Sequence, residues 1–315
     1  MTPSPFVIET AGLTKRFGGR TVVQDVELQV PRGSAFGYLG PNGAGKTTLI
    51  RMLLGLTRAT SGSMSLLGLP VPQRRGEALA RVGAIVEEPR FHRYLTGREN
   101  LEIVAAARGP EAAHRIDGAI ERVGLARRAN DRVGTYSLGM RQRLGIARLL
   151  LADPELLILD EPMNGLDPAG IEEFRFLIRS LVAEGRTVML SSHLLDEVEK
   201  TVDALAIVDQ GRVVVQGSIA DLTRNGPATL MIASADNSRA RHVLGSHAAV
   251  SSIVSEEGIL RVQLGRVDER VEHEAFADIN RRLVEAGIPV YRLEPEHASL
   301  ERRFLEITSR LEEAA

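Results

Sequence analysis

Short apolar runs alternate with helical patterns from the start of the chain to about Ile219. The predicted strands are residues 35–39, 156–160, 187–191 and 205–208. Several of them are apolar on both faces, as buried parallel strands are. One set of apolar residues between 160 and 187 recurs at helical spacing, and Gly185 then stops that helix. The set is Ile171, Phe174, Leu177, Ile178, Leu181 and Val182. This succession of strand, helix and strand predicts an α/β architecture.

The pattern is interrupted by a cluster of turn-forming residues, Asn225-Gly226-Pro227. The segments after it predict strand 228–233, helix 238–245, strand 259–264, helix 274–286, strand 288–293 and helix 298–311. We therefore expect one domain over residues 1–224 and a small C-terminal α+β domain over residues 225–315. The alternative is that the later residues wrap around the first domain.

The amino-acid composition excludes several classes of protein and of functional site. The 315 residues are 43% hydrophobic, which is ample for buried cores. Formal net charge is −2 with both signs mixed, so no broad basic field exists for nucleic acid. The absence of cysteine excludes disulfides and cysteine-based metal or nucleophile sites. The opening MTPSPFVIET lacks the features of a secretory signal, and no run reaches the roughly 20 apolar residues of a membrane span. A cytosolic location follows, and any membrane crossing belongs to another chain.

A phosphate-binding loop is the first chemical motif. Residues 40–47, GPNGAGKT, fit G-x-x-x-x-G-K-[ST] and lie between an apolar strand and a helical pattern. Its glycines let backbone amides turn toward phosphate oxygens at a helix N-terminus. Lys46 would meet the β- and γ-phosphates, and the Thr47 hydroxyl would ligate magnesium. The predicted nucleotide-binding residues are Gly40, Pro41, Asn42, Gly43, Ala44, Gly45, Lys46, Thr47 and Thr48.

An acidic pair follows the strand LLILDE, residues 156–161. The pattern places Asp160 at the carboxyl edge of the sheet, where α/β folds bind ligands. Asp160 can then hold magnesium, directly or through water. Glu161 is the candidate that positions or deprotonates the attacking water. A solvated loop end is the ordinary explanation of a lone Asp-Glu pair, but the upstream phosphate loop favours catalysis.

The segment Tyr136 to Arg143, YSLGMRQR, resembles the ABC (ATP-binding cassette) signature, whose commoner form is LSGGQ. Leu138 and Met140 depart from that form, while Ser137 and Gly139 keep it. The phosphate loop, this signature, the Asp-Glu pair, the loop from Asn164 to Asp167 and then His193 resemble the ABC ATPase family in content and order. The resemblance covers about residues 6 to 222. It implies a P-loop NTPase fold with a mixed sheet core and a helical subdomain.

The resemblance also implies that two such domains pair head to tail, so one chain carries two incomplete half-sites. Ser137 and Gly139 would then bind the γ-phosphate of an ATP held by the partner domain. Asp167 would link the half-sites, and His193 would contact the γ-phosphate and orient the water. Phe17 matches the family aromatic that stacks on adenine, and Val22 could complete the apolar floor.

Glu87 is a departure, because most ABC proteins have glutamine at this point of the loop that touches magnesium and the membrane partner. A carboxylate there would add negative charge beside Asp160 and Glu161, bind magnesium more tightly and raise a neighbour's pKa. We expect it to be a metal and coupling ligand; the alternative is neutral drift. The glutamate form and the segment Tyr94 to Leu101 resemble the bacitracin-resistance and lantibiotic-immunity exporters. Residues 300–307 resemble the last helix of daunorubicin-type exporter ATPases, although an ordinary amphipathic helix explains them equally well.

These features predict an ATP- and Mg²⁺-dependent ATPase subunit of an exporter. Every residue that ATP hydrolysis requires is present in the sequence. By the resemblance, its partners are separate transmembrane permease subunits and a second copy or a homologous ATPase. It would sit at the inner face of the cell membrane through the permease. The alternatives are an importer subunit and a soluble ABC protein acting on ribosomes or DNA. The soluble classes usually carry two cassettes or a long coiled coil, neither of which this chain has.

Overall fold

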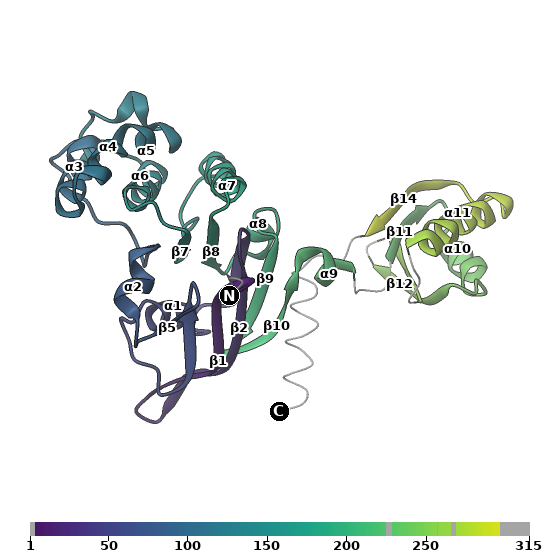
Figure 1. Cartoon of the computed structure of the whole chain (residues 1–315). Coiled ribbons are helices and arrows are strands. Elements are labelled where there is room, and N and C mark those ends of the chain that lie inside the picture. The colour runs from purple at the N-terminus through teal and green to yellow at the C-terminus, as the bar shows by residue number, and fades with distance from the viewer. Residues whose placement is uncertain (1–3, 225–228, 257, 266–268, 297–315) are drawn as a thin grey trace. The chain divides into compact units, whose positions relative to one another are not determined.

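The computed structural model describes residues 4–224, 229–256, 258–265 and 269–296. The chain forms two compact units, Met1–Ile219 and Ala220–Ala315, each described here by itself (Figure 1). This division falls after residue 219, and the sequence pattern placed the boundary after residue 224. The helix predicted at 298–311 lies outside the described residues.

A six-stranded sheet forms the centre of the first unit, with strand order β10-β9-β3-β8-β7-β6. All neighbours are parallel except β10, which runs antiparallel to β9. The four strands predicted for this unit are confirmed within one residue at each end. The strands are β3 Ala35–Leu39, β6 Val82–Ile85, β7 Leu156–Leu159, β8 Thr187–Ser192, β9 Ala204–Asp209 and β10 Arg212–Ser218.

A second sheet, of antiparallel strands in the order β2-β1-β4-β5, was not predicted from the sequence. Its strands are β1 Phe6–Phe17, β2 Arg20–Pro31, β4 Ser61–Leu66 and β5 Leu69–Val71. Helix α1, Lys46–Leu53, buries Leu49 and Ile50 in a core that also contains Ile8 of β1 and Phe36 of β3. One hydrophobic core therefore holds both sheets and the helix that begins at Lys46.

Helices gather on one side of this unit, where α3 to α5 lie away from the strands in Figure 1, while α6 packs against β6. A capping box starts α3: the Thr96 hydroxyl accepts from the Glu99 amide at 3.1 Å, and Glu99 accepts from the Thr96 amide at 2.7 Å. The segment from Tyr94 to Leu101, which the sequence analysis singled out, therefore contains the capped start of α3. The helices are α2 Arg75–Ala80, α3 Gly97–Arg108, α4 Pro110–His114, α5 Ile116–Arg122, α6 Leu138–Leu150, α7 Pro168–Ala183 and α8 Leu195–Glu199, with 3-10 turns at Ala126–Arg128 and Val133–Thr135.

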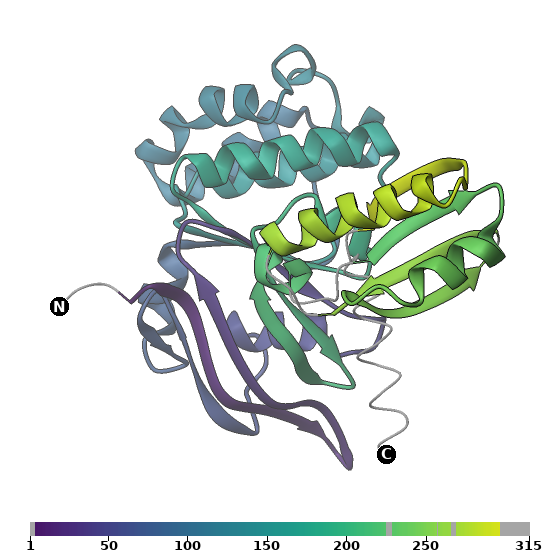
Figure 2. The same ribbon diagram turned by 90° about the vertical axis from the view of Figure 1, so that its right-hand side faces the viewer.

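The second unit has a β-α-β-β-α-β order and a fully antiparallel sheet, β12-β13-β11-β14. This is the split βαβ arrangement, seen in green and yellow in Figure 2. Strand β12 was missed by the sequence pattern, and α11 begins earlier than predicted. The elements are α9 Ile219–Arg224, β11 Thr229–Ser234, α10 Asn237–Leu244, β12 Val250–Glu256, β13 Ile259–Leu264, α11 Glu269–Glu285 and β14 Val290–Glu296.

The core of the second unit is separate from that of the first, and it contains Leu230, Val262 and Ile279. Ile279→Ala should therefore lower the free energy of unfolding of this unit by about 3 kcal/mol, because it leaves a cavity under α11. Calorimetry of the full chain should show a lower melting temperature for the transition of the second unit. The transition of the first unit should keep its stabilisation by ATP. Val284→Ala is the matched control on the same helix, since Val284 is 63% exposed. Equal effects of the two substitutions would contradict the described core.

Candidate functional site

The loop from Gly40 to Gly45 joins β3 to the first turn of α1. Its shape requires glycine, because Gly43 and Gly45 have φ of 85° and 93°. A Cβ on Gly40 would lie 2.2 Å from the Val208 carbonyl oxygen, and one on Gly45 would lie 2.5 Å from the Val22 carbonyl oxygen. The loop is thus pressed against β9 and β2, with the amides at the start of α1 beside it.

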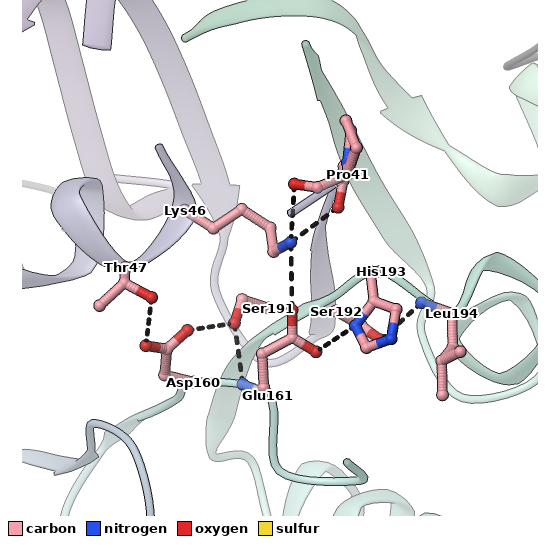
Figure 3. A network of polar contacts seen from close by, with 10 residues as sticks. Pro41, Lys46, Thr47, Asp160, Glu161, Ser191, Ser192, His193 and Leu194 are labelled. Carbon is pink, nitrogen blue, oxygen red and sulfur yellow. Dashed lines mark hydrogen bonds and ion pairs between the residues drawn. The ribbon is translucent and has the colours of Figure 1, made fainter. Parts of the chain in front are cut away.

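Lys46 is the buried cation of this region, with 6% of its surface exposed. Its ammonium donates to the carbonyl oxygens of Gly40 at 2.7 Å and Pro41 at 3.2 Å (Figure 3). Glu161 Oε1 lies 3.1 Å from the same nitrogen. The predicted phosphate-binding lysine and the predicted catalytic carboxylate are therefore an ion pair.

Asp160 is buried directly after β7 and uses both carboxylate oxygens. Thr47 Oγ1 donates to Asp160 Oδ2 at 2.7 Å, and Ser191 Oγ donates to Asp160 Oδ1 at 2.6 Å. Ser191 Oγ also accepts from the Glu161 amide at 2.9 Å. Sequence reasoning missed Ser191, although a serine that ends an otherwise apolar buried strand was a usable signal. This hydroxyl orients both acidic residues.

His193 follows β8 and lies beside Glu161; both residues were predicted to act on the attacking water. Its Nδ1 is 2.9 Å from Glu161 Oε2. Glu161 itself has φ of 47°, a left-handed conformation that is uncommon outside glycine. The Lys46 ammonium and the His193 ring contact different oxygens of one carboxylate, so the position of the Glu161 side chain is fixed from two sides.

The phosphate loop borders a cavity of about 360 Å³. Arg20 also lines it, a cation that sequence reasoning did not select. Phe17 does not line this cavity, but its ring is 53% exposed and carries the Lys15 ammonium 4.6 Å from its centre. Predicted residues that do line it are Val22, Asn42, Gly43, Gly45, Lys46, Thr47, Thr48 and Glu161.

Ser137 and Asp167 lie outside that cavity and begin two helices. Ser137 Oγ accepts from the Met140 amide at 3.2 Å to cap α6, and Asp167 Oδ1 accepts from the Gly170 amide at 3.0 Å to cap α7. The signature and the Asn164 to Asp167 loop lie side by side, because a Cβ on Gly165 would be 3.0 Å from Leu138 Cδ2. Ser137 and Asp167 are both exposed.

Glu87 has φ of 66° and is exposed in the loop after β6. Its Oε1 lies 2.6 Å from Arg51 Nη2 near the end of α1, and its carboxylate forms no hydrogen bond with Asp160 or Glu161. Sequence reasoning missed Arg51, which neutralises the extra charge that Glu87 introduces. The role of Glu87 as a metal ligand stays a prediction.

Magnesium can be tested against the donor set. No group of three His, Cys, Asp or Glu side chains suitable for a metal occurs among the residues that the structure describes. Thr47 and Asp160 nevertheless bring two oxygens within 2.7 Å of each other beside the loop. Magnesium is usually held by one or two protein oxygens with substrate phosphates and water, so this pair fits the ion.

Comparison with known proteins identifies relatives. The family described as "ABC transporter" matches residues 23–164. The bacitracin transport ATP-binding protein BcrA of Bacillus licheniformis is 41% identical over 96% of this chain and 97% of its own length. The lantibiotic transport ATP-binding protein SrtF of Streptococcus pyogenes is 40% identical over 67% of this chain and 90% of its own. A solved ATP-binding subunit of an ABC transporter is 31% identical, with a TM-score of 0.61 over 69% of this chain and 92% of that one.

Ser191→Ala should lower the ATP hydrolysis rate about tenfold while leaving ATP affinity within a few-fold, because it removes the hydroxyl that orients Asp160 and Glu161. Steady-state kinetics and nucleotide titration measure the two quantities. Thr187→Val is the matched control: this buried hydroxyl of the same strand accepts from the Gly33 amide at 2.8 Å, outside the acidic pair. A similar fall in rate for both variants would show a purely structural effect.

Proposed function

This chain belongs to the family of ABC transporter ATP-binding proteins, and from that premise we propose that it powers export of an antibiotic or other drug through a separate permease. It binds and hydrolyses ATP. The observation that carries the proposal is the Glu161 carboxylate, held between Lys46 and His193 beside the phosphate loop. The full-length similarity to a bacitracin transport subunit supports the choice of cargo class.

The residues of this chain divide the chemistry among themselves. Loop amides and the Lys46 ammonium bind phosphate oxygens of ATP and offset their charge. Glu161 accepts a proton from the attacking water, and His193 holds the second oxygen of that carboxylate in place. Thr47 and Asp160 would hold magnesium, which when bound neutralises phosphate charge. Phe17, the exposed last residue of β1, offers a ring to adenine.

The second half of each ATP site comes, in this proposal, from a second copy or a homologous subunit. Ser137 and Gly139 would approach the γ-phosphate of the partner's nucleotide, and Asp167 would meet the partner's site. Support comes from their placement: Ser137 and Asp167 are exposed at the starts of α6 and α7, outside the cavity that the phosphate loop lines. The helix N-terminus at Ser137 suits an anion that arrives from outside the chain.

A groove of about 360 Å³ beside Glu87 is our candidate contact for the permease. It is lined by apolar residues that include Leu54, Leu56 and Val86, and Leu56 is exposed. Its floor belongs to β6 and the loop that carries Glu87, so a helix of the permease seated here would sense the position of that loop. Across the described residues, no helix is long and apolar enough to cross a membrane. We place the chain at the inner face of the membrane through this contact.

Export is favoured over the alternatives by the relatives. Those reported above are transport proteins, and the Nod factor export ATP-binding protein I of Cupriavidus pinatubonensis is 41% identical over 69% of this chain and 67% of its own length. An action on ribosomes or DNA has no support among them. We therefore keep export through a permease as the single proposed function.

Glu161→Gln should keep ATP binding, abolish at least about 99% of turnover and trap a nucleotide-bound dimer, because the amide cannot accept the proton of the water. Phosphate release and size-exclusion chromatography with ATP measure these effects. Glu155→Gln is a control for loss of a carboxylate near β7, since Glu155 pairs with Arg81 and Arg32 at the opposite end of that strand. A monomeric Glu161→Gln variant with full hydrolysis would refute both the role of Glu161 and the half-site arrangement.

Glu87→Gln should raise the magnesium concentration needed for half-maximal ATPase activity about fivefold, because a neutral amide binds the ion less strongly. Arg51→Gln should lower it, since it frees the Glu87 carboxylate, and Arg51→Gln should have no effect once Glu87 is glutamine. Magnesium titrations of the ATPase with and without reconstituted permease measure this cycle. Glu88→Gln is the control in the same loop. Unchanged magnesium dependence and coupling in Glu87→Gln would mean that Glu87 is not a ligand.

A further inference from the structure

A groove of about 1150 Å³ lies in the second unit, between α10 and α11. Nothing in ATP hydrolysis uses it, because all of its lining residues come from this unit. The lining residues are Ser238, Arg241, His242, Val243, Gly245, Ser246, Asp278, Arg281, Arg282 and Glu285.

Three guanidinium groups face this groove. Arg281 and Arg282 come from α11, and Arg241 comes from α10 on the opposite side. The Arg241 side chain makes no hydrogen bond or ion pair with any residue that the structure describes. Like charges on facing helices are unfavourable unless an anion lies between them. Ion pairs with Asp278 on the same helix account for the presence of Arg281 and Arg282. Arg241 has no such pair, so its presence in the groove is not accounted for in this way.

A buried histidine sets the geometry of the α11 side. His247 is 7% exposed, and its Nδ1 accepts from the Ala249 amide at 3.1 Å. The proton therefore lies on Nε2, which donates to Asp278 Oδ2 at 3.1 Å. Asp278 in turn accepts from Arg282 Nε at 3.0 Å and from Arg281 Nη1 at 3.1 Å. The chain of contacts runs from a buried ring to a carboxylate and then to two guanidinium groups.

The carboxylate of Asp278 accepts from all three of these donors. Desolvation raises the pKa of Asp278, but the hydrogen bond and charge of Arg282, and then those of His247, outweigh it and lower the pKa. Asp278 thus stays ionised and holds the arginines, while Arg282 keeps both Nη groups and Arg281 keeps Nη2 for another acceptor. Besides Asp278, the groove is lined by a second carboxylate, Glu285, which is exposed and opposes an incoming anion.

We propose that the groove between α10 and α11 binds the phosphate group of an anionic ligand, with Arg241, Arg281 and Arg282 as the binding residues. A guanidinium offers two parallel donors that match phosphate oxygens, and three of them around one groove surround a tetrahedral anion. His247 and Asp278 are positioning residues that hold two of the three. The same chemistry fits a phospholipid headgroup and a free phosphate compound, and the experiment separates these sources.

The test uses the full chain with its ATP sites saturated by a non-hydrolysable ATP analogue, so that the phosphate loop does not bind the probes. The first arm measures binding of inorganic phosphate by equilibrium dialysis. The second measures flotation with vesicles of phosphatidylglycerol mixed into phosphatidylcholine, compared with phosphatidylcholine alone. Arg241→Gln should weaken binding about tenfold, and ATP hydrolysis should be unchanged, because Arg241 supports no other described contact.

Two matched variants sharpen the result. Arg239→Gln removes one charge from the same helix at a side chain that does not line the groove, and it should leave binding unchanged. Glu285→Gln removes the opposing carboxylate and should strengthen binding. Binding of phosphate alone identifies a free phosphate compound, and binding confined to phosphatidylglycerol vesicles identifies a headgroup. Binding of neither probe, equal binding by wild type and Arg241→Gln, or an equal loss in Arg239→Gln overturns the proposal.

Discussion

Burial of the Lys46 ammonium is the constraint on which the ATP site depends. A charge removed from water is stable only with close partners, and Lys46 finds two loop carbonyl oxygens and one carboxylate. The carbonyls are available because the glycines of the loop let it fold back over the side chain. The carboxylate is available because Glu161 reaches across from the end of β7. The loop conformation and the Glu161 carboxylate therefore stabilise each other.

The parallel register of the central sheet places the remaining groups. Leu159 of β7 lies opposite Leu190 of β8, so Asp160, the first residue after β7, comes beside Ser191, which is still paired with Tyr38 of β3. The hydrogen bond from Ser191 to Asp160 and the one from the Glu161 amide to Ser191 follow from that register. The site is thus built at the carboxyl edge of neighbouring strands, where an α/β sheet exposes backbone and side-chain ends to a ligand.

Much of this could be predicted because the signals are local. The loop from Gly40 to Thr47 carries its motif in consecutive residues, so it could be recognised from the sequence. The strand predicted at 35–39 is continuously apolar and was confirmed. Strands β1 and β12 were missed, because half-exposed strands carry polar residues that weaken the pattern, as the serines of β12 do. Ser191 and Arg51 were missed for a different reason: each acts through a residue far away in sequence, Asp160 and Glu87 respectively.

By itself, the sequence determined the α/β class, the family and the residues of the phosphate loop, since contiguous motifs and periodicity encode them. It also indicated a second, smaller domain over residues 225–315. Only the tertiary structure decided which carboxylate neutralises Lys46, that Arg51 pairs with Glu87, and that three arginines of the C-terminal unit face one groove. The physical reason is that Coulomb and hydrogen-bond energies depend on distance in space, and chain order does not specify such distances between separate elements.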